Sequence, residues 1–383
     1  DSVNGRLDFP FTIRNQVRTS FSTIQAGVEM REDLLRYRRE FLETGLREAA
    51  RDPVQGYVFG DAADPARTYL MMDVLRRHDI RLHRNSRDIE KDGRTWPAGT
   101  AYVVPARQPQ YRLVKAVFET RTSFADNTFY DVSSWNFPHA FGLPYAPLEG
   151  GELAGATGED AAGATFPVGN LQGAENPYAY AFDWDNYFAP RVLNHLLRQG
   201  VRARVATRGF TVDTPAGRRD FGYGSIVIPV GIQDRQGQGL TATLRGLTEQ
   251  LPVEVIALGS GLTPGGIDLG SPSLRPLRQP KPVIVVGDGV SSYEAGQAWH
   301  LLDSRMGIPV SLVEADRLRR MKLHEVTHII LVNGSYDFGE EGTEKIKRWV
   351  REGGVLIAIK RGVRWVKDAG LVPFELREPD SLN

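Results

Sequence analysis

Short apolar runs alternate with helical patterns along most of this sequence. The pattern is clearest in the last third, where apolar runs without polar alternation lie at residues 281–288, 308–313, 327–332 and 354–359. Runs of this kind predict strands that are buried on both faces. A helical pattern from Tyr293 to Leu302 separates the first two runs. Strands joined by helices predict right-handed crossovers, so we expect an α/β fold with open, mostly parallel sheets and flanking helices.

A similar order of elements is predicted twice more, earlier in the chain. The first block has predicted strands at 56–60, 80–83 and 99–105 and helices at 66–78 and 110–119. The second has predicted strands at 178–182, 201–205, 224–229 and 253–258 and helices at 190–199 and 241–251. Gln108 and Gln233 follow Pro105 and Pro229 at matching places. The offset between the blocks is roughly 120 residues throughout, which predicts an internal repeat.

The first fifty residues carry a helical pattern instead. Apolar side chains recur every three or four positions from Ile13 to Val28 and again from Leu34 to Leu42. This spacing predicts one long helix over 12–50, or two consecutive helices, since Gly27 weakens the middle. A helix with such a continuous apolar face needs a partner surface that covers this face. It either packs on the domain that follows or belongs to a domain upstream.

These patterns divide the chain into four parts. Residues 1–50 form a helical segment, which we expect to be the tail of an upstream domain. Residues 51–165 form an α/β unit, 166–265 a second unit that repeats the first, and 281–383 a third. The polar stretches 149–165 and 259–280 are rich in glycine, and the second also in proline, so they are predicted to be linkers or surface excursions.

Composition narrows the classes of function. The chain has 383 residues with 47 basic and 47 acidic side chains, so its net charge is zero. It therefore has no strong electrostatic field that would attract nucleic acid or an anionic membrane. No apolar run approaches the roughly 20 residues that a membrane-spanning helix needs. The absence of cysteine excludes disulfides, thiolate metal sites and cysteine nucleophiles.

Two motifs resemble known sites but lie in the wrong context. His324, Glu325 and His328 have the H-E-x-x-H spacing of a zinc site, which requires both histidines on one face of a helix. The β-branched run that begins at Thr327 predicts a strand, so we reject these residues as zinc ligands. The glycine-rich stretch 259–265 lacks the third glycine and the helix of a dinucleotide-binding loop, so we interpret it as a structural turn.

Two aromatic clusters are candidates for binding. Tyr130, Trp135 and His139 belong to the first cluster, and Trp184 and Asp185 belong to the second. Rings beside carboxylates and amides can stack sugars or bind a peptide. The alternative is a seam between domains, where large amphipathic rings dominate the contact area. Asp183 and Asp185 of the second cluster are either an acid/base pair or, more simply, turn-forming residues.

The segment 355–365 resembles the strand-to-helix elbow of class I glutamine amidotransferase-like domains. In those domains an apolar strand leads to cysteine, one further residue and glycine. Here Lys360 stands at the cysteine position and Gly362 keeps the glycine. The likeness implies an amidotransferase-like unit over 281–383 that lacks its nucleophile. Lys360 is then a base, an anion contact or a salt-bridged surface lysine.

The chain as a whole resembles the C-terminal, non-peptidase region of bacterial zinc carboxypeptidase-like proteins of the carboxypeptidase A family. The likeness is carried by residues 9–17 with the helix that follows, 96–105 with Gln108 and Pro109, 129–135, and the elbow. In that family a peptidase domain holds zinc through an H-x-x-E pair and a later histidine, and a glutamate acts as general base. The resemblance places these groups upstream of Asp1, and it implies export to the periplasm or beyond.

We therefore expect an accessory, non-catalytic region that supports or orients substrate for an upstream peptidase domain. That domain is the expected partner and the expected carrier of zinc, and no cofactor is expected in this chain. Neither nucleic acid nor a membrane span is expected. Two alternatives stay open. One is an independent glycan- or peptide-binding module that uses the aromatic clusters, and the other is an amidotransferase-like enzyme with a changed nucleophile.

Overall fold

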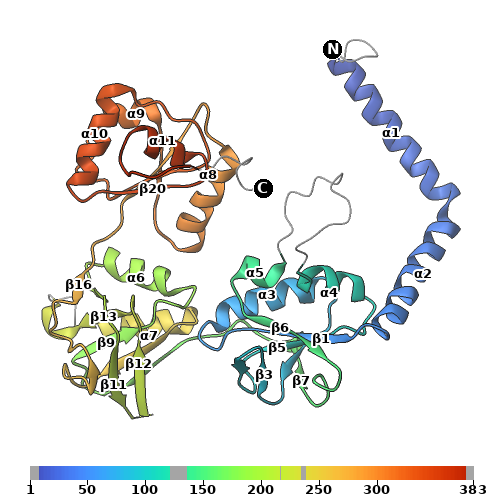
Figure 1. Ribbon diagram of the computed structural model, residues 1–383, viewed down its shortest axis with the longest axis horizontal. Coiled ribbons are helices and arrows are strands. Elements are labelled where there is room, and N and C mark those ends of the chain that lie inside the picture. Colours follow the sequence, from blue (N-terminus) through green and yellow to red (C-terminus); the bar gives the residue numbers. More distant parts are fainter. Residues whose placement is uncertain (1–7, 121–135, 216, 234–238, 377–383) are drawn as a thin grey trace. The chain divides into compact units, whose positions relative to one another are not determined.

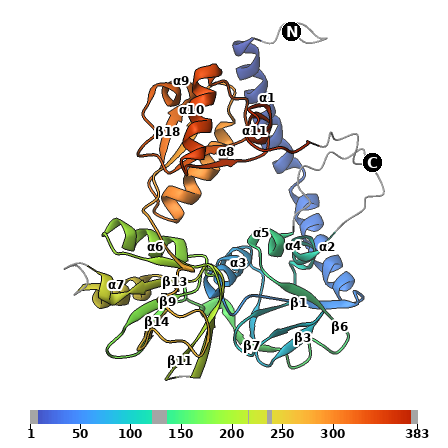
Figure 2. The ribbon, with the colours of Figure 1, turned by 60° about the vertical axis from the view of Figure 1, so that its left-hand side comes forward.

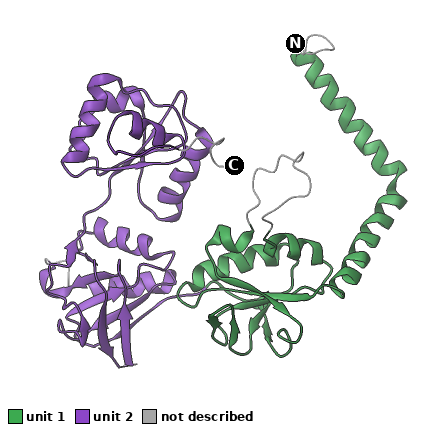
Figure 3. Ribbon diagram, in the orientation of Figure 1, with its two compact units in different colours: residues 1–166 green, residues 167–383 purple. Residues whose placement is uncertain are grey.

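The chain divides into two compact units, residues 1–166 and 167–383 (Figure 3). The computed structural model describes residues 8–120, 136–215, 217–233 and 239–376. Both units mix helices and strands, as the sequence predicts, and among the described residues one sheet is parallel throughout. Within the described residues, no helix combines the length and the apolar character needed to cross a membrane.

The first unit begins with two consecutive helices, α1 (Phe9–Glu29) and α2 (Arg31–Ala49). Asp8 caps α1, because its carboxylate accepts the N–H of Phe11 at 2.8 Å. The predicted break in the helix occurs at Met30, not at Gly27. α1 buries none of its residues, whereas the last turns of α2 are partly buried.

A five-stranded sheet with the order β6-β1-β5-β2-β7 follows these helices. Its strands are β1 (Val54–Phe59), β2 (His83–Asn85), β5 (Tyr102–Pro105), β6 (Tyr145–Glu149) and β7 (Thr157–Asp160). Helices α3 (Pro65–Arg77), α4 (Tyr111–Phe118) and α5 (Phe137–Phe141) cover one face, and the hairpin β3 (Ile89–Lys91) and β4 (Arg94–Trp96) covers the other (Figure 1). All four neighbouring pairs are antiparallel.

The second unit opens with a six-stranded sheet of the order β16-β10-β13-β9-β14-β8. Its strands are β8 (Asn170–Gly173), β9 (Ala179–Phe182), β10 (Arg204–Ala206), β13 (Ile226–Pro229), β14 (Glu254–Leu258) and β16 (Leu274–Pro276). Helices α6 (Ala189–Arg198) and α7 (Leu240–Gln250) lie on one face, and β11 (Phe210–Thr214) with β12 (Gly217–Phe221) and β15 (Gly265–Gly266) lies on the other (Figure 2). Only β8 and β14 pair in parallel.

The expectation of mostly parallel strands is wrong for these two sheets. Their strands are apolar on both faces because a helix layer covers one side and a hairpin covers the other. Without β8, the second sheet reads β14-β9-β13-β10-β16, which matches β6-β1-β5-β2-β7 element for element and supports the predicted repeat. The stretches predicted to be linkers supply β7, β15 and β16, so the second sheet extends beyond residue 265.

The last part of the second unit is a parallel sheet, as predicted. Its order is β18-β17-β19-β20, with β17 (Pro282–Val286), β18 (Ser311–Glu314), β19 (His328–Leu331) and β20 (Val355–Ala358). Helix α8 (Ser292–Trp299) and the π-helical turn His300–Arg305 pack on one face. Helices α9 (Ala315–Arg320), α10 (Gly339–Arg351) and α11 (Gly362–Asp368) pack on the other.

Candidate functional site

The carboxyl ends of the parallel strands β17, β19 and β20 form a defined edge. Ligands of open α/β sheets bind outside this edge. The loops after β17 and β19 are joined there, because the N–H of Ser291 donates to the carbonyl of Asn333 at 2.9 Å and the N–H of Ser335 donates to that of Gly289 at 3.0 Å. Helix α8 starts at the same place, where the Ser291 hydroxyl accepts the N–H of Glu294 at 3.4 Å.

Lys360 completes this edge from the end of β20. Its ammonium group forms an ion pair with Glu294, and the two side chains are 60% and 19% exposed. The backbone of Lys360 has a φ of 52°, a left-handed conformation that costs a residue with a Cβ about 1–2 kcal/mol. A Cβ on Gly362 would lie 2.6 Å from the carbonyl oxygen of Leu331, so only glycine fits. The turn therefore has the strained strand-to-helix geometry of an elbow, with an ion-paired lysine on it.

The groups at this edge limit its chemistry. Lys360 and Glu294 neutralise each other, so neither stands as an isolated charge. Asn333 Oδ1 is buried and has no hydrogen-bond partner in the described part of the chain. Such an oxygen can accept a hydrogen bond from a small polar group or from water. A mostly apolar cavity of about 350 Å³ lies beside the edge and is lined in part by Val290, Trp299 and Leu312.

The H-E-x-x-H segment does not adopt the geometry of a zinc site. His324 and Glu325 lie in a turn, and His328 is the first residue of β19, as the predicted strand requires. Glu325 lies 3.7 Å from Lys281, and burial lowers the pKa of His328. Among the described residues, no group of three or more histidines and carboxylates is placed to hold a metal ion. The segment therefore lacks the helix on which an H-E-x-x-H zinc site places its two histidines.

Of the three candidates in the first aromatic cluster, only His139 lies among the described residues. Tyr130 and Trp135 lie outside the described residues. His139 is in α5, where its N–H donates to Asn136 Oδ1 at 3.0 Å and its ring packs edge-on against Tyr145 at 5.5 Å. These contacts give His139 a local structural role at the start of α5.

Trp184 and Asp185 follow β9 in the second unit. Trp184 is 39% exposed and packs against the backbone of Gly224, where a Cβ would lie 3.3 Å from that of Trp184. Asp185 is exposed, and its neighbour Asp183 accepts hydrogen bonds from Arg219 at 2.8 Å and Ser225 at 3.1 Å. Asp183 is therefore held by its partners and not by a second carboxylate, which disfavours the acid/base pair.

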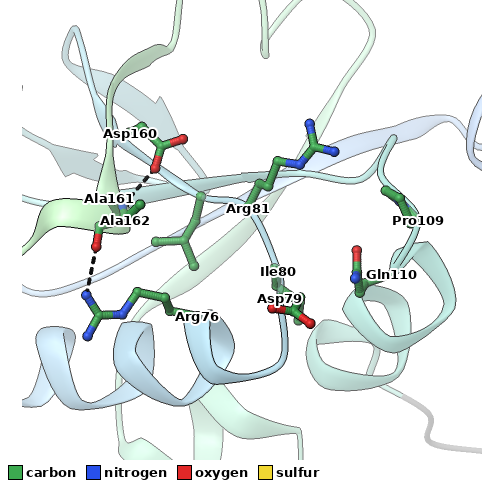
Figure 4. Close-up of a pocket in the computed structure, with 10 residues that line it drawn as sticks. Arg76, Asp79, Ile80, Arg81, Pro109, Gln110, Asp160, Ala161 and Ala162 are labelled. Carbon is green, nitrogen blue, oxygen red and sulfur yellow. Dashed lines mark hydrogen bonds between the residues drawn. The ribbon is translucent and has the colours of Figure 1, made fainter.

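The first two sheets, which share a strand order, carry corresponding cavities that the sequence did not indicate. In the first unit, a cavity of about 410 Å³ lies between the end of α3 and the chain that leads into β2 (Figure 4). Arg76 closes one side by donating to the carbonyl of Ala162 at 3.0 Å, and Arg81 and Gln110 line it (Figure 4). In the second unit, a cavity of about 390 Å³ lies at the end of α6 and contains Arg202. The sequence pattern that lies near these two cavities is the matching pair of glutamines, Gln108 and Gln233.

A further candidate is the apolar face of α1 and α2, which we call the apolar stripe. Its exposed members are Ile13, Val17, Phe21, Ile24 and Val28 on α1 and Leu34, Leu35 and Phe41 on α2. Successive α1 positions are three or four residues apart, so their side chains share one face of the helix. Contiguous exposed apolar surface of this kind marks an interaction site.

No known protein family, curated protein or solved structure matches this chain.

Proposed function

We propose that this chain is an accessory region of a zinc carboxypeptidase-like protein, and that the apolar stripe docks it onto a peptidase domain of the same polypeptide. The observation that carries this proposal is the exposure of the stripe along its whole length. α1 buries no residue, and a lone helix is marginal in water, where most helix stability comes from packing an apolar face. A domain that covers the stripe therefore stabilises the helix and fixes its own position.

The attachment of α2 to the first unit supports this role. Arg112 of α4 forms an ion pair with Glu48 at 2.6 Å, and Asp52 accepts hydrogen bonds from Lys115 at 2.7 Å and Tyr111 at 2.5 Å. Several bonds thus join the end of α2 to α4, and a domain bound to the stripe would be tied to the first sheet. A firm connection is what a region needs if it is to orient a peptidase domain or its substrate.

The product of the complete reading frame tests the proposal. We expect an H-x-x-E pair and a later histidine in frame before Asp1, one zinc ion per complete polypeptide, and peptidase activity that chelation abolishes. Phe21→Glu in the stripe is expected to lower the stability of the complete polypeptide, whereas Leu262→Glu, at an exposed position after β14, serves as the control. Stoichiometric zinc in residues 1–383 alone, with chelation-sensitive peptide hydrolysis, would contradict the proposal.

A second candidate, a glycan- or peptide-binding module, is favoured by one observation. Trp184 keeps 39% of its surface exposed, and Tyr223, which precedes Gly224, is 79% exposed. Exposed amphipathic rings are common in binding surfaces. Titration with neutral oligosaccharides is expected to change tryptophan fluorescence in the unmodified chain but not in Trp184→Phe. An equal response in both proteins would remove this candidate.

A further inference from the structure

The cavity beside the edge of the parallel sheet is built on one face of α8. Ser292, Ala295, Gly296 and Trp299 line it at positions i, i+3, i+4 and i+7 of this helix, so their side chains share that face. Leu312 of β18 also lines it. Because the two middle helix positions hold alanine and glycine, space remains that larger side chains would fill. The resulting volume of about 350 Å³ falls within the roughly 300–1,000 Å³ typical of small-molecule sites.

Gly296 keeps the cavity open without a packing reason. Glycine inside a helix is destabilising relative to alanine, and a Cβ at Gly296 would meet no atom within 4 Å. Its neighbour Ala295 belongs to the apolar core that holds α8 on the sheet, together with Ile284 and Ile330. A larger side chain at position 296 would therefore occupy the cavity and leave the anchoring of the helix intact.

Most of the cavity wall is apolar, which selects an apolar body for the ligand. Val286 and Val290 join Trp299 and Leu312 in the wall, and the last two are 38% and 52% exposed. A bound molecule would thus remove apolar surface from water, which is the main favourable term in binding to such a wall. The face of the Trp299 indole also attracts cations.

Two carboxylates lie next to residues of the cavity wall. Glu314, the last residue of β18, pairs in register with Val286. A Cβ on Gly287, another residue of the wall, would lie 3.3 Å from Cγ of Glu314, so this side chain passes close to the cavity. Asp288 follows Gly287 in the chain and is exposed, as Glu314 is. The cavity therefore combines an apolar wall with negative charge near Gly287.

The charges around the cavity favour a cation. Asp288 and Glu314 form no ion pair within the described ranges. Lys360, at the same edge of the sheet, is already balanced by Glu294. The N-terminus of α8 adds roughly half a positive charge, which two full carboxylate charges outweigh. An anion would meet net negative charge here, whereas an ammonium ion would be stabilised.

We infer that this cavity binds a small organic cation, with its ammonium group beside Glu314 and Asp288 and its apolar body against Trp299 and Leu312. A cavity of this size holds a compact amine with a single ring. A π-helical turn begins at His300, directly after Trp299, and such turns are frequent at functional sites. The site shares no residue with the apolar stripe, so it is independent of the proposed function.

Three probes that share a ring and differ in charge test this assignment. 2-Phenylethylamine is protonated at neutral pH, 2-phenylethanol is uncharged, and phenylacetate is an anion. Calorimetric titration of the whole chain is expected to show saturable binding, with the amine about tenfold tighter than the acid and the alcohol in between. Nα-acetyl-lysine amide distinguishes the source of the ammonium group, because tighter binding of this probe than of the ring amine assigns the site to a lysine side chain of a peptide.

Variants of the cavity wall locate the binding. Gly296→Leu is expected to abolish binding of both the amine and the alcohol, while circular dichroism and urea unfolding show that it remains folded. Gln297→Leu, at an exposed α8 position outside the cavity wall, is the matched control. Glu314→Gln alters an exposed side chain, so it tests the site without disturbing the core. It is expected to weaken the amine about two- to fivefold and to leave the alcohol unchanged.

Three results overturn the inference. The first is the absence of saturable binding for every probe. The second is equal affinity for the amine and the acid in the unmodified chain, because the carboxylates then select nothing. The third is binding of the amine that survives Gly296→Leu, since it then occurs elsewhere in the chain.

Discussion

Gln108 and Gln233 hold corresponding turns of the first two sheets with the same three hydrogen bonds. Gln108 Oε1 accepts the N–H of Arg81 at 2.7 Å, and its Nε2 donates to the carbonyls of Arg81 at 3.1 Å and of the proline that ends the preceding strand at 2.7 Å. Gln233 makes the same contacts with Arg202 at 2.9 and 2.8 Å and with its own preceding proline at 2.7 Å. Each amide thus ties the end of one strand to the start of its neighbour.

Gln108→Ala is expected to destabilise the first unit by about 1–3 kcal/mol, because it leaves backbone groups unpaired around a side chain that is only 4% exposed. Gln233→Ala is expected to cost less, since its surroundings are more exposed. Urea unfolding monitored for each variant provides the measurement. Gln279→Ala, at an exposed position, is the control. An equal loss of stability in all three variants would show that the hydrogen bonds of Gln108 and Gln233 have no special role.

Lys360→Gly and Lys360→Ala separate backbone strain from the ion pair. Both remove the contact with Glu294, but only glycine relieves the left-handed backbone. We expect the glycine variant to be more stable than the alanine variant by about 1 kcal/mol in denaturant unfolding. If alanine is the more stable of the two, the turn is not strained and the elbow geometry loses its physical basis.

Gly354→Ala is expected to be among the most destabilising single substitutions in the parallel sheet. A Cβ at this position would overlap the ring of Trp349, whose indole N–H donates to the carbonyl of Val326 at 3.1 Å and fixes the ring. A loss of about 1–3 kcal/mol, with a changed near-ultraviolet circular dichroism signal, is predicted. Gly246→Ala in α7 is the matched control, because its Cβ meets open space and should leave stability unchanged or slightly raised.

Asp52 predicts a specific dependence of stability on pH. Burial alone raises the pKa of this carboxyl, but hydrogen bonds from Lys115, Tyr111 and the N–H of Val54 outweigh it and hold the pKa below its usual value. A lowered folded pKa contributes stability that is fully present above about pH 4 and is lost as the pH falls through the folded value. Asp52→Asn should therefore be less stable than the unmodified chain at pH 7, and the difference should shrink towards pH 3.

Urea unfolding at both pH values measures this effect. Tyr111→Phe removes one of the hydrogen bonds but keeps the carboxylate, so it should fall between the other two proteins at pH 7. A constant difference between Asp52→Asn and the unmodified chain from pH 7 to pH 3 would contradict the assignment.

The positions of most long helices and core strands could be predicted from the sequence, because buried apolar runs and helical spacing are local signals. The direction of the strands was predicted correctly for the last sheet but not for the first two. Burial on both faces is typical of parallel sheets, but here hairpins provide the second layer. One signal was available for the first hairpin, since Asp92-Gly93 between β3 and β4 is typical of a tight two-residue turn and both residues have positive φ.

Less of the candidate site than of the fold could be predicted from the sequence. Lys360 was identified from its place after an apolar strand, but its left-handed backbone and its pairing with Glu294 depend on contacts across the sheet. The packing of Trp184 on Gly224 depends on the antiparallel pairing of β9 with β13, which was not predicted. The spacing of the apolar stripe was visible, whereas its exposure could be learned only from the structure.

Hydrogen exchange of residues 9–29 tests the central claim most directly. In the chain alone α1 has no buried residue, so its amides should exchange at rates close to those of a fraying helix. In the product of the complete reading frame, a docked peptidase domain should slow the same amides by about a hundredfold or more, which corresponds to about 2.7 kcal/mol of protection. Equal and rapid exchange of these amides in both proteins would contradict the account.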